Sequence, residues 1–261
     1  MTSKYFFLAL LSVITLAALN CVGDRAQTAN PGPSASQPIN RAATGENLEV
    51  GDLLDAVTRT YSKLRYYRSK GVNQVRSDFD GNVKNTAAIP FEIEYVRGAN
   101  SVIKWVQDDR QKVFSIRGKD SWLETDGRKD QTFVSPREGL MMVTLAEGAR
   151  SLFEIHVFVF RDELLIREKF FKPLVDPEIK GEESVDGHAC YMLTGTYGGV
   201  EARDTYWVDR ESFLIRRIER VIVVRKQVEE KEYVRTTTTT ENYSDIELEA
   251  NDKKSDGGAK P

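Results

Sequence analysis

The 261-residue chain is poor in the side chains on which most enzymes depend. It has two cysteines and two histidines, too few for the usual zinc ligand sets, and it contains neither CxxC nor HExxH. GxSxG, a P-loop and a GxGxxG between a strand and a helix are also absent. We therefore expect no catalytic residue, no bound metal and no cofactor.

The chain also has no large excess of positive or negative residues. The chain has 37 Lys and Arg against 40 Asp and Glu, which leaves a formal net charge of -3. The two signs are interspersed along the sequence and form no long blocks. Nucleic-acid-binding proteins usually carry a clustered basic surface, so nucleic acid is excluded as an expected partner.

The N-terminus carries the longest apolar stretch. Lys4 is followed by an uncharged, largely apolar run from Tyr5 to Leu19. About 20 residues are needed to cross a bilayer, so this run is short for a membrane span and typical of a signal-peptide core. We predict a signal peptide over residues 1–20; the alternative is a short anchor that is never removed.

Cys21 follows directly, in "LAALNC". An apolar run that ends in cysteine resembles the lipobox of bacterial lipoproteins, in which the thiol receives a diacylglycerol. The resemblance implies that Cys21 is a lipid anchor, although Asn20 stands where the lipobox has a small residue. Val22 replaces the aspartate that retains some lipoproteins at the inner membrane, which favours the outer membrane.

The composition divides the remaining chain into three parts. Residues 21–46 are rich in Pro, Gly, Ser, Ala and Asn and lack large apolar side chains, so they are predicted to be a flexible tether. Residues 249–261 are predicted to be a disordered tail. One folded domain is expected over residues 47–248.

Apolar spacing predicts the elements of this domain. Leu53, Val57, Tyr61 and Leu64 recur at helical spacing. From "FEIEYV" at residue 91 the period changes to two, and short strands follow at regular intervals to residue 134. A second series of strands is expected from about residue 182 to residue 248, and its threonine run 236–240 suits a strand.

Two helices are expected between the two series of strands. Ser135, Pro136 and Glu138 form a predicted capping box at the start of the first helix. "RDELLIREKFFK" at residues 161–172 predicts the second, and residues 152–160 are ambiguous between strand and buried helix. The expected fold class is α+β, with a curved antiparallel β-sheet, an open half-barrel, and helices covering its concave face.

The stretch "SVDGHACYMLTG" holds one histidine and one cysteine two positions apart. In a strand, His188, Cys190 and Met192 share a face, so a His–Cys nucleophile is conceivable on spacing alone. The apolar neighbours of Cys190 favour a buried, unreactive thiol instead. We therefore assign the pair to the scaffold.

Aromatic side chains stand out on the predicted strands. A curved sheet that few helices cover leaves room for an apolar ligand between the layers, although a plain core explains the same residues. The candidate lining residues are Phe91, Tyr95, Trp105, Trp122, Met141, Leu145 and Trp207.

Two stretches resemble one known family. "LLDAVTRTYSKLRYYRSKGVNQV" and "VDGHACYMLTGTYGGVEARDTYWVDRESFLIRRIER" are similar to the opening helix and the second half of LolA-like proteins, the outer-membrane lipoprotein-sorting superfamily. The resemblance extends over about residues 50–240 and is greatest with exported branches whose role is uncharacterised. It implies an open half-barrel with a helical lid and no catalytic cysteine. The arginine that latches the lid in carrier members has no assigned counterpart here.

The resemblance leads to two functional hypotheses. The first is a monomeric, non-catalytic cell-envelope lipoprotein on the periplasmic side, anchored in the outer membrane through Cys21, that binds an acyl chain, lipid or lipoprotein in trafficking. The alternative is an envelope regulatory or sensory protein that uses the same fold to bind a protein partner. An enzyme working through His188 and Cys190 is the least favoured reading.

Overall fold

The computed structural model describes residues 48–146, 174–197, 201–229 and 231–250, and these described residues belong to one compact unit. The predicted signal peptide, Cys21, the tether, residues 152–172 and the tail from residue 251 lie outside the described residues. Among the described residues, no helix has the length and apolar character needed to cross a membrane.

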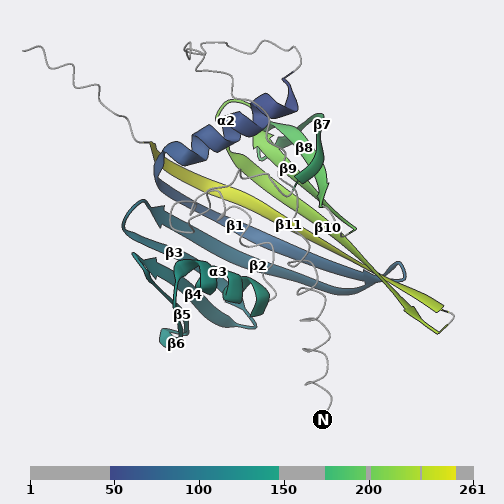
Figure 1. The fold of residues 1–261 in the computed structure, drawn as a ribbon, viewed down its shortest axis with the longest axis horizontal. Coiled ribbons are helices and arrows are strands. Elements are labelled where there is room, and N and C mark those ends of the chain that lie inside the picture. Colours follow the sequence, from purple (N-terminus) through teal and green to yellow (C-terminus); the bar gives the residue numbers. More distant parts are fainter. Residues whose placement is uncertain (1–47, 147–173, 198–200, 230, 251–261) are drawn as a thin grey trace, which may run out of the picture. The chain divides into compact units, whose positions relative to one another are not determined.

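The described chain builds a single 11-stranded antiparallel sheet with two helices (Figure 1). The elements in chain order are α2 (Val50–Lys63), β1 (Leu64–Phe79), β2 (Asn82–Val96), β3 (Asn100–Gln107), β4 (Arg110–Arg117), β5 (Asp120–Thr125), β6 (Arg128–Phe133), α3 (Pro136–Ala146), β7 (Leu174–Val185), β8 (His188–Tyr197), β9 (Ala202–Asp209), β10 (Ile215–Val228) and β11 (Lys231–Ala250). The open curved sheet and the α+β class expected from the sequence are confirmed.

The strand order places the first and last strands at the centre. It runs β6-β5-β4-β3-β2-β1-β11-β10-β9-β8-β7, so two meanders extend outward from the β1–β11 pair. That pair runs in register from Leu64↔Ala250 to Phe79↔Arg235, with two irregularities. The sheet therefore cannot form fully until the last strand has joined the first.

Both series of strands begin earlier in the chain than the sequence predicted. Strand structure begins at Leu64 rather than residue 91, and it resumes at Leu174 rather than residue 182. β1 reads "LRYYRSKGVNQVRSDF", in which polar residues occupy both faces and hide the period of two. β7 contains a proline, a positive-φ glycine and two register irregularities, which disrupt the same signal.

Side-chain hydrogen bonds mark the end of α2 and the start of α3. α2 buries Leu53, Val57 and Tyr61 along one side. Its last carbonyls accept hydrogen bonds from Arg97, whose Nη2 lies 2.8 Å from the Ser62 oxygen. At α3 the Glu138 N–H donates to Ser135 Oγ over 3.2 Å, which confirms the capping serine.

Alternation along the strands separates the residues into two faces. We call the face that carries Tyr67, Ile93, Tyr206 and Tyr243 the inner face; it holds the main hydrophobic core together with α2 and α3. The outer face carries a small separate cluster of Val185, Cys190 and Trp207, with Met192 packed against it. The functional question depends on which face each residue occupies.

Candidate functional site

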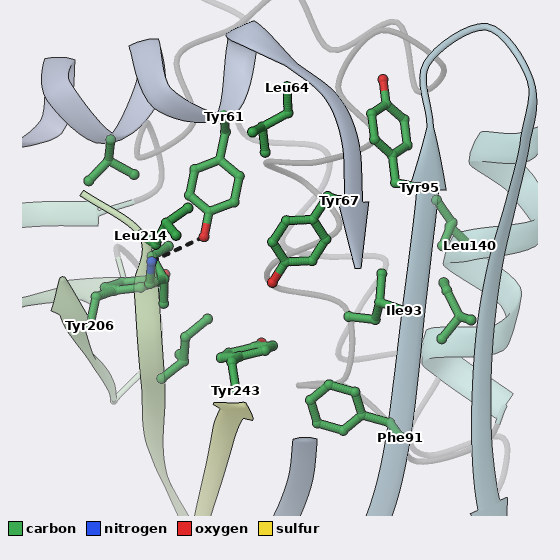
Figure 2. Packing of buried hydrophobic residues seen from close by; sticks show 14 of the residues in the cluster. Tyr61, Leu64, Tyr67, Phe91, Ile93, Tyr95, Leu140, Tyr206, Leu214 and Tyr243 are labelled. Carbon is green, nitrogen blue, oxygen red and sulfur yellow. Dashed lines mark hydrogen bonds between the residues drawn. The ribbon is translucent and has the colours of Figure 1, made fainter. Parts of the chain in front are cut away.

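Aromatic side chains converge on the inner face of the central strands (Figure 2). β1, β2 and β11 contribute Tyr67, Phe91 and Tyr243, and all three are buried. The Phe91 and Tyr243 rings meet edge to face, with centroids 5.5 Å apart. In Figure 2 these rings lie between α2 on one side and α3 on the other. We call this group, with Tyr61 and Tyr95, the inner-face aromatic cluster.

Gly71 on β1 makes this arrangement possible. It pairs with Phe91 on β2 and with Tyr243 on β11. A Cβ at this position would overlap both the Phe91 ring and the backbone oxygen of Asn242. Glycine therefore lets the Phe91 ring lie over the β1 backbone, a close approach that no other residue allows.

The hydroxyl groups of the cluster have different surroundings. Tyr61 Oη accepts a hydrogen bond from the Ile215 N–H over 3.1 Å, which ties α2 to β10. Burial raises the pKa of Tyr61, and the neighbouring Tyr67 raises it further. Tyr61 is therefore a neutral structural group at every physiological pH.

Tyr67 and Ser69 are both buried, and neither hydroxyl oxygen has a hydrogen-bond partner of ordinary geometry. Burial raises the pKa of Tyr67 well above its usual value, and the nearby Ser69 hydroxyl offsets part of that rise. A buried polar group left without a partner costs about 1–3 kcal/mol. These two hydroxyls lie among the rings of the inner-face aromatic cluster and are therefore placed to hydrogen-bond a ligand.

The inner face also holds buried charge toward β9 and β10. Asp204 is fully buried and forms a two-pronged ion pair with Arg220, with Arg220 Nε 2.7 Å from Oδ1. The Tyr206 hydroxyl donates to the same carboxylate over 3.1 Å. Because the two charges neutralise each other, the pair is better suited to holding β9 and β10 in register than to acid–base catalysis.

A second buried carboxylate belongs to β11. Glu241 is fully buried and accepts a hydrogen bond from the Tyr243 hydroxyl. Burial, and then the Glu241 charge, raise the pKa of Tyr243 well above its usual value. The tyrosine therefore stays protonated and remains a donor to the carboxylate.

The structure divides the predicted lining residues between the two faces. Phe91, Tyr95 and Trp105 are buried together on the inner face, and Phe91 pairs with Trp105 across β2 and β3. Trp207 belongs to the outer-face cluster, and Trp122 alternates with the buried inner-face Leu123 and so faces outward as well. Met141 and Leu145 lie on α3, but their side chains are outside the described part of the chain.

His188 and Cys190 lie on the outer face of β8, away from the aromatic cluster. His188 Nδ1 contacts Asp209 Oδ2 at 2.9 Å, whereas the nearest polar partner of Cys190 Sγ is the backbone oxygen of His188 at 3.5 Å. Burial, and then the charge of Asp209, raise the pKa of Cys190 to about 11. The cysteine is therefore a neutral thiol at neutral pH, and the pair lacks the thiolate that a nucleophile needs.

Asp209 organises the turn after β9. Its Oδ1 accepts hydrogen bonds from the N–H groups of Glu211 and Ser212 at 3.0 and 2.9 Å. Burial alone would raise the pKa of this carboxyl, but those N–H groups and Arg216 lower it below its ordinary value. The carboxylate is thus a charged turn-former that also holds His188.

Sequence reasoning missed the residues at the centre of the inner face. Tyr67, Ser69 and Tyr243 were not among the predicted lining residues because β1 showed no alternation and β11 was treated as a strand with one face in water. One signal was available: Gly71 lies at the middle of an aromatic-rich stretch, and a glycine inside a strand often marks a close approach.

Comparisons with known proteins give structural likeness only. No family model and no curated protein matches the sequence. Among solved structures, the lipoprotein LppX of Mycobacterium tuberculosis is 12% identical, covers 73% of this chain and 94% of its own, and has a TM-score of 0.39. LprF from Mycobacterium bovis is also 12% identical, with 74% of this chain and 90% of its own covered and a TM-score of 0.39.

A LolA superfamily protein from Nitrosomonas europaea matches at 12% identity, with 78% of this chain and 94% of its own covered and a TM-score of 0.32. The similarity to the LolA superfamily expected from the sequence motifs thus recurs as a similarity between structures. At these identities and TM-scores, it carries no information about what this chain binds.

Proposed function

We propose that this chain is an exported, membrane-tethered binding protein whose inner sheet face binds an acyl chain of a lipid or lipoprotein without covalent chemistry. The inner-face aromatic cluster is the observation that carries the proposal. It gathers buried aromatic side chains from three strands and α2 around two buried hydroxyls, of Tyr67 and Ser69, that lack partners of ordinary geometry. Apolar walls with a few convergent polar groups are typical of small-molecule sites.

The energetics are adequate for such a ligand. Each buried methylene contributes about 0.8 kcal/mol, so an acyl chain burying about ten of them gains ~8 kcal/mol. That corresponds to a dissociation constant of about 1 μM before ordering costs. A hydrogen bond from Tyr67 or Ser69 to an ester or carboxyl oxygen would orient the head of the chain.

The N-terminal sequence supports the location. A signal peptide over residues 1–20, a lipidated Cys21 and a tether to residue 46 would hold the domain near the outer membrane on its periplasmic side. Triacylated cysteine anchors a protein firmly, whereas a single chain binds only marginally. The tether of about 25 residues would extend at most ~90 Å, which keeps the inner face within reach of the lipid surface.

The test uses the chain from residue 21 onward with Cys21→Ser, which removes the proposed anchor. After delipidation, a palmitoyl photo-crosslinking probe is added and the labelled peptides are identified by mass spectrometry. We expect labelled peptides from β1, β2 and β11. Labelling confined to the outer face, or no saturable labelling, would refute the proposal.

The variant Tyr67→Phe separates an effect on ligand binding from an effect on stability. The Tyr67 hydroxyl interacts with Ser69 but forms no hydrogen bond of ordinary geometry, so its removal should change stability little, yet weaken binding of a fatty acid about 3–10-fold. Thr194→Val is the matched control, because the Thr194 hydroxyl lies on the outer face and donates to the Asp204 backbone oxygen, so its loss should lower stability while leaving fatty-acid affinity unchanged. Equal affinities for wild type and Tyr67→Phe would remove Tyr67 from the site.

A further inference from the structure

The first half of β2 has a run of backbone that lacks a second partner strand among the described residues. β2 pairs with β1 along its whole length, from Tyr66↔Val96 to Phe79↔Asn82. Its pairing with β3 covers only Phe91 to Glu94. Residues 82–90 therefore have a partner strand on one side and none, among the described residues, on the other.

Pro90 explains why the pairing with β3 ends, and it indicates which backbone N–H and C=O groups of β2 point away from β1. It lies opposite Val72 in the β1–β2 ladder. A proline is tolerated there only if its missing N–H would have pointed away from β1. In an antiparallel strand this direction alternates, so Thr86 and Ala88 also direct their N–H and C=O groups away from β1.

This edge is open to solvent. Every residue from Asn82 to Ala88 is exposed, and Ile89 is half-buried. The sequence "NVKNTAAIP" contains a single charge, Lys84, at the β-bulge opposite Ser77 and Asp78. Lys84, the bulge and Pro90 limit strand pairing at this edge, but between them the outward N–H and C=O groups of Thr86 and Ala88 are available to another strand.

The other open edges of the described sheet are irregular, short or covered. β7 has Pro177, two register irregularities and a positive-φ Gly181. β6 is only six residues long and begins Arg-Lys-Asp. The part of β10 beyond its β9 pairing is covered by Glu201, whose oxygen accepts from the Val223 N–H at 2.8 Å and whose carboxylate pairs with Arg225.

We propose that residues 82–89 form a strand-addition site for an extended peptide of a partner protein, with apolar and acidic residues in alternation. The outward backbone N–H and C=O groups of residues 82–89 would hydrogen-bond to the backbone of the added strand. The incoming strand would place one set of side chains beside Ala87 and Ile89 on the apolar inner face. The other set would lie beside Thr86 and Ala88 on the outer face, where Arg76 is the cross-strand neighbour of Thr86.

Charge selects the kind of peptide. Lys84 makes no ion pair with any described residue, and the edge carries no acidic group to balance it. Two copies of this edge paired antiparallel would bring their Lys84 residues near each other, and like charges across strands are destabilising. An acidic peptide gains from the same lysine. The site would give the chain a protein-binding function that does not depend on the inner-face aromatic cluster.

The experiment measures amide hydrogen exchange by NMR on the chain from residue 21 onward with Cys21→Ser. In the free protein, the Thr86 and Ala88 amides should exchange fast and Ala87, bonded to β1, slowly. Adding the acetylated, amidated heptapeptide Glu-Val-Glu-Val-Glu-Val-Glu should slow Thr86 and Ala88 at least ten-fold. No change at these two amides would overturn the proposal.

Three variants make the test specific. Thr86→Pro removes an outward donor and should abolish binding of the fluorescein-labelled peptide, whereas Thr86→Val keeps the donor and should bind it normally. Lys84→Glu should lose the acidic peptide and gain its Lys-Val counterpart, a reversal that misfolding cannot produce. Equal binding by Thr86→Pro and wild type refutes the site, and a dimer in sedimentation velocity that Thr86→Pro abolishes would replace the peptide with a second copy.

Discussion

The two faces of the sheet bury similar chemical groups, but these groups have different roles. Each face carries a buried aspartate held by an arginine, Asp204 with Arg220 on the inner face and Asp209 with Arg216 on the outer face. The inner pair lies beside the main core, on the same face as the aromatic cluster, whereas the outer pair closes a turn next to His188 and Cys190. Residue types alone therefore say little; the face that a residue occupies decides what it can do.

Removing one partner of the inner ion pair should give the largest effect. Arg220→Met leaves Asp204 buried and unpaired, which is expected to lower the free energy of unfolding by about 3–5 kcal/mol. Arg225→Met is the control, because its ion pair with Glu201 is exposed and should be worth less than about 1 kcal/mol. Urea denaturation measures both, and similar losses would show that the inner pair is no more important than a surface pair.

A methyl group at Gly71 tests the close packing of the inner face. Gly71→Ala should cost about 3 kcal/mol, because the new Cβ meets the Phe91 ring and the β11 backbone. Gly51→Ala on α2 meets nothing nearby and should be neutral or stabilising. If Gly71→Ala kept wild-type stability, the inner-face packing described above would be incorrect.

The outer pair is expected to show a smaller, pH-dependent effect. The pKa of Asp209 is lowered in the folded state, so its contribution is present above the unfolded value of about 3.9 and is lost as pH falls through the folded value. Asp209→Asn should therefore cost about 1–3 kcal/mol at pH 7 and progressively less toward pH 3. A destabilisation that stays constant across this range would rule out a role for the carboxylate charge.

The smallest expected signal concerns Cys190. Because it is buried and its pKa is raised to about 11, a disulfide reagent at pH 8 should label it at least about 100-fold more slowly in the native than in the unfolded protein. The Cys21→Ser chain is used, so that Cys190 is the only thiol. Rapid native labelling would reopen the case for a reactive pair with His188.

Prediction succeeded where a local pattern mirrors a local environment. The capping serine of α3, the α2 face with Leu53 and Val57, and the alternation of "FEIEYV" each reflect contacts within one element. It failed at β1, where Arg68 pairs with Glu92 on the neighbouring strand and Asn73 and Ser69 are buried in the sheet. Polar residues buried by partners distant in sequence leave no apolar period to detect.

The candidate site shows the same contrast between residues whose burial depends on local pattern and residues whose burial depends on distant strands. Phe91, Tyr95 and Trp105 were found because they alternate on short strands, and Tyr67, Ser69 and Tyr243 were missed because their burial depends on the β1–β11 pair. Trp122 and Trp207 resembled the first group in sequence yet lie on the outer face. Register decides this, since a shift of one residue moves every side chain of a strand to the opposite face.

By itself, the sequence determined the fold class, the turns between short strands, and the unreactive setting of Cys190, since composition and local spacing suffice for these. Only the tertiary structure decided which aromatic rings share a face, that Asp204 and Arg220 meet, and that residues 82–89 lack a second partner strand in the described part of the sheet. The aromatic rings of β1, β2 and β11 share a face because β11 joins β1, which brings together residues more than 150 positions apart. No local pattern encodes that closure, because its free energy comes from contacts that exist only in the complete sheet.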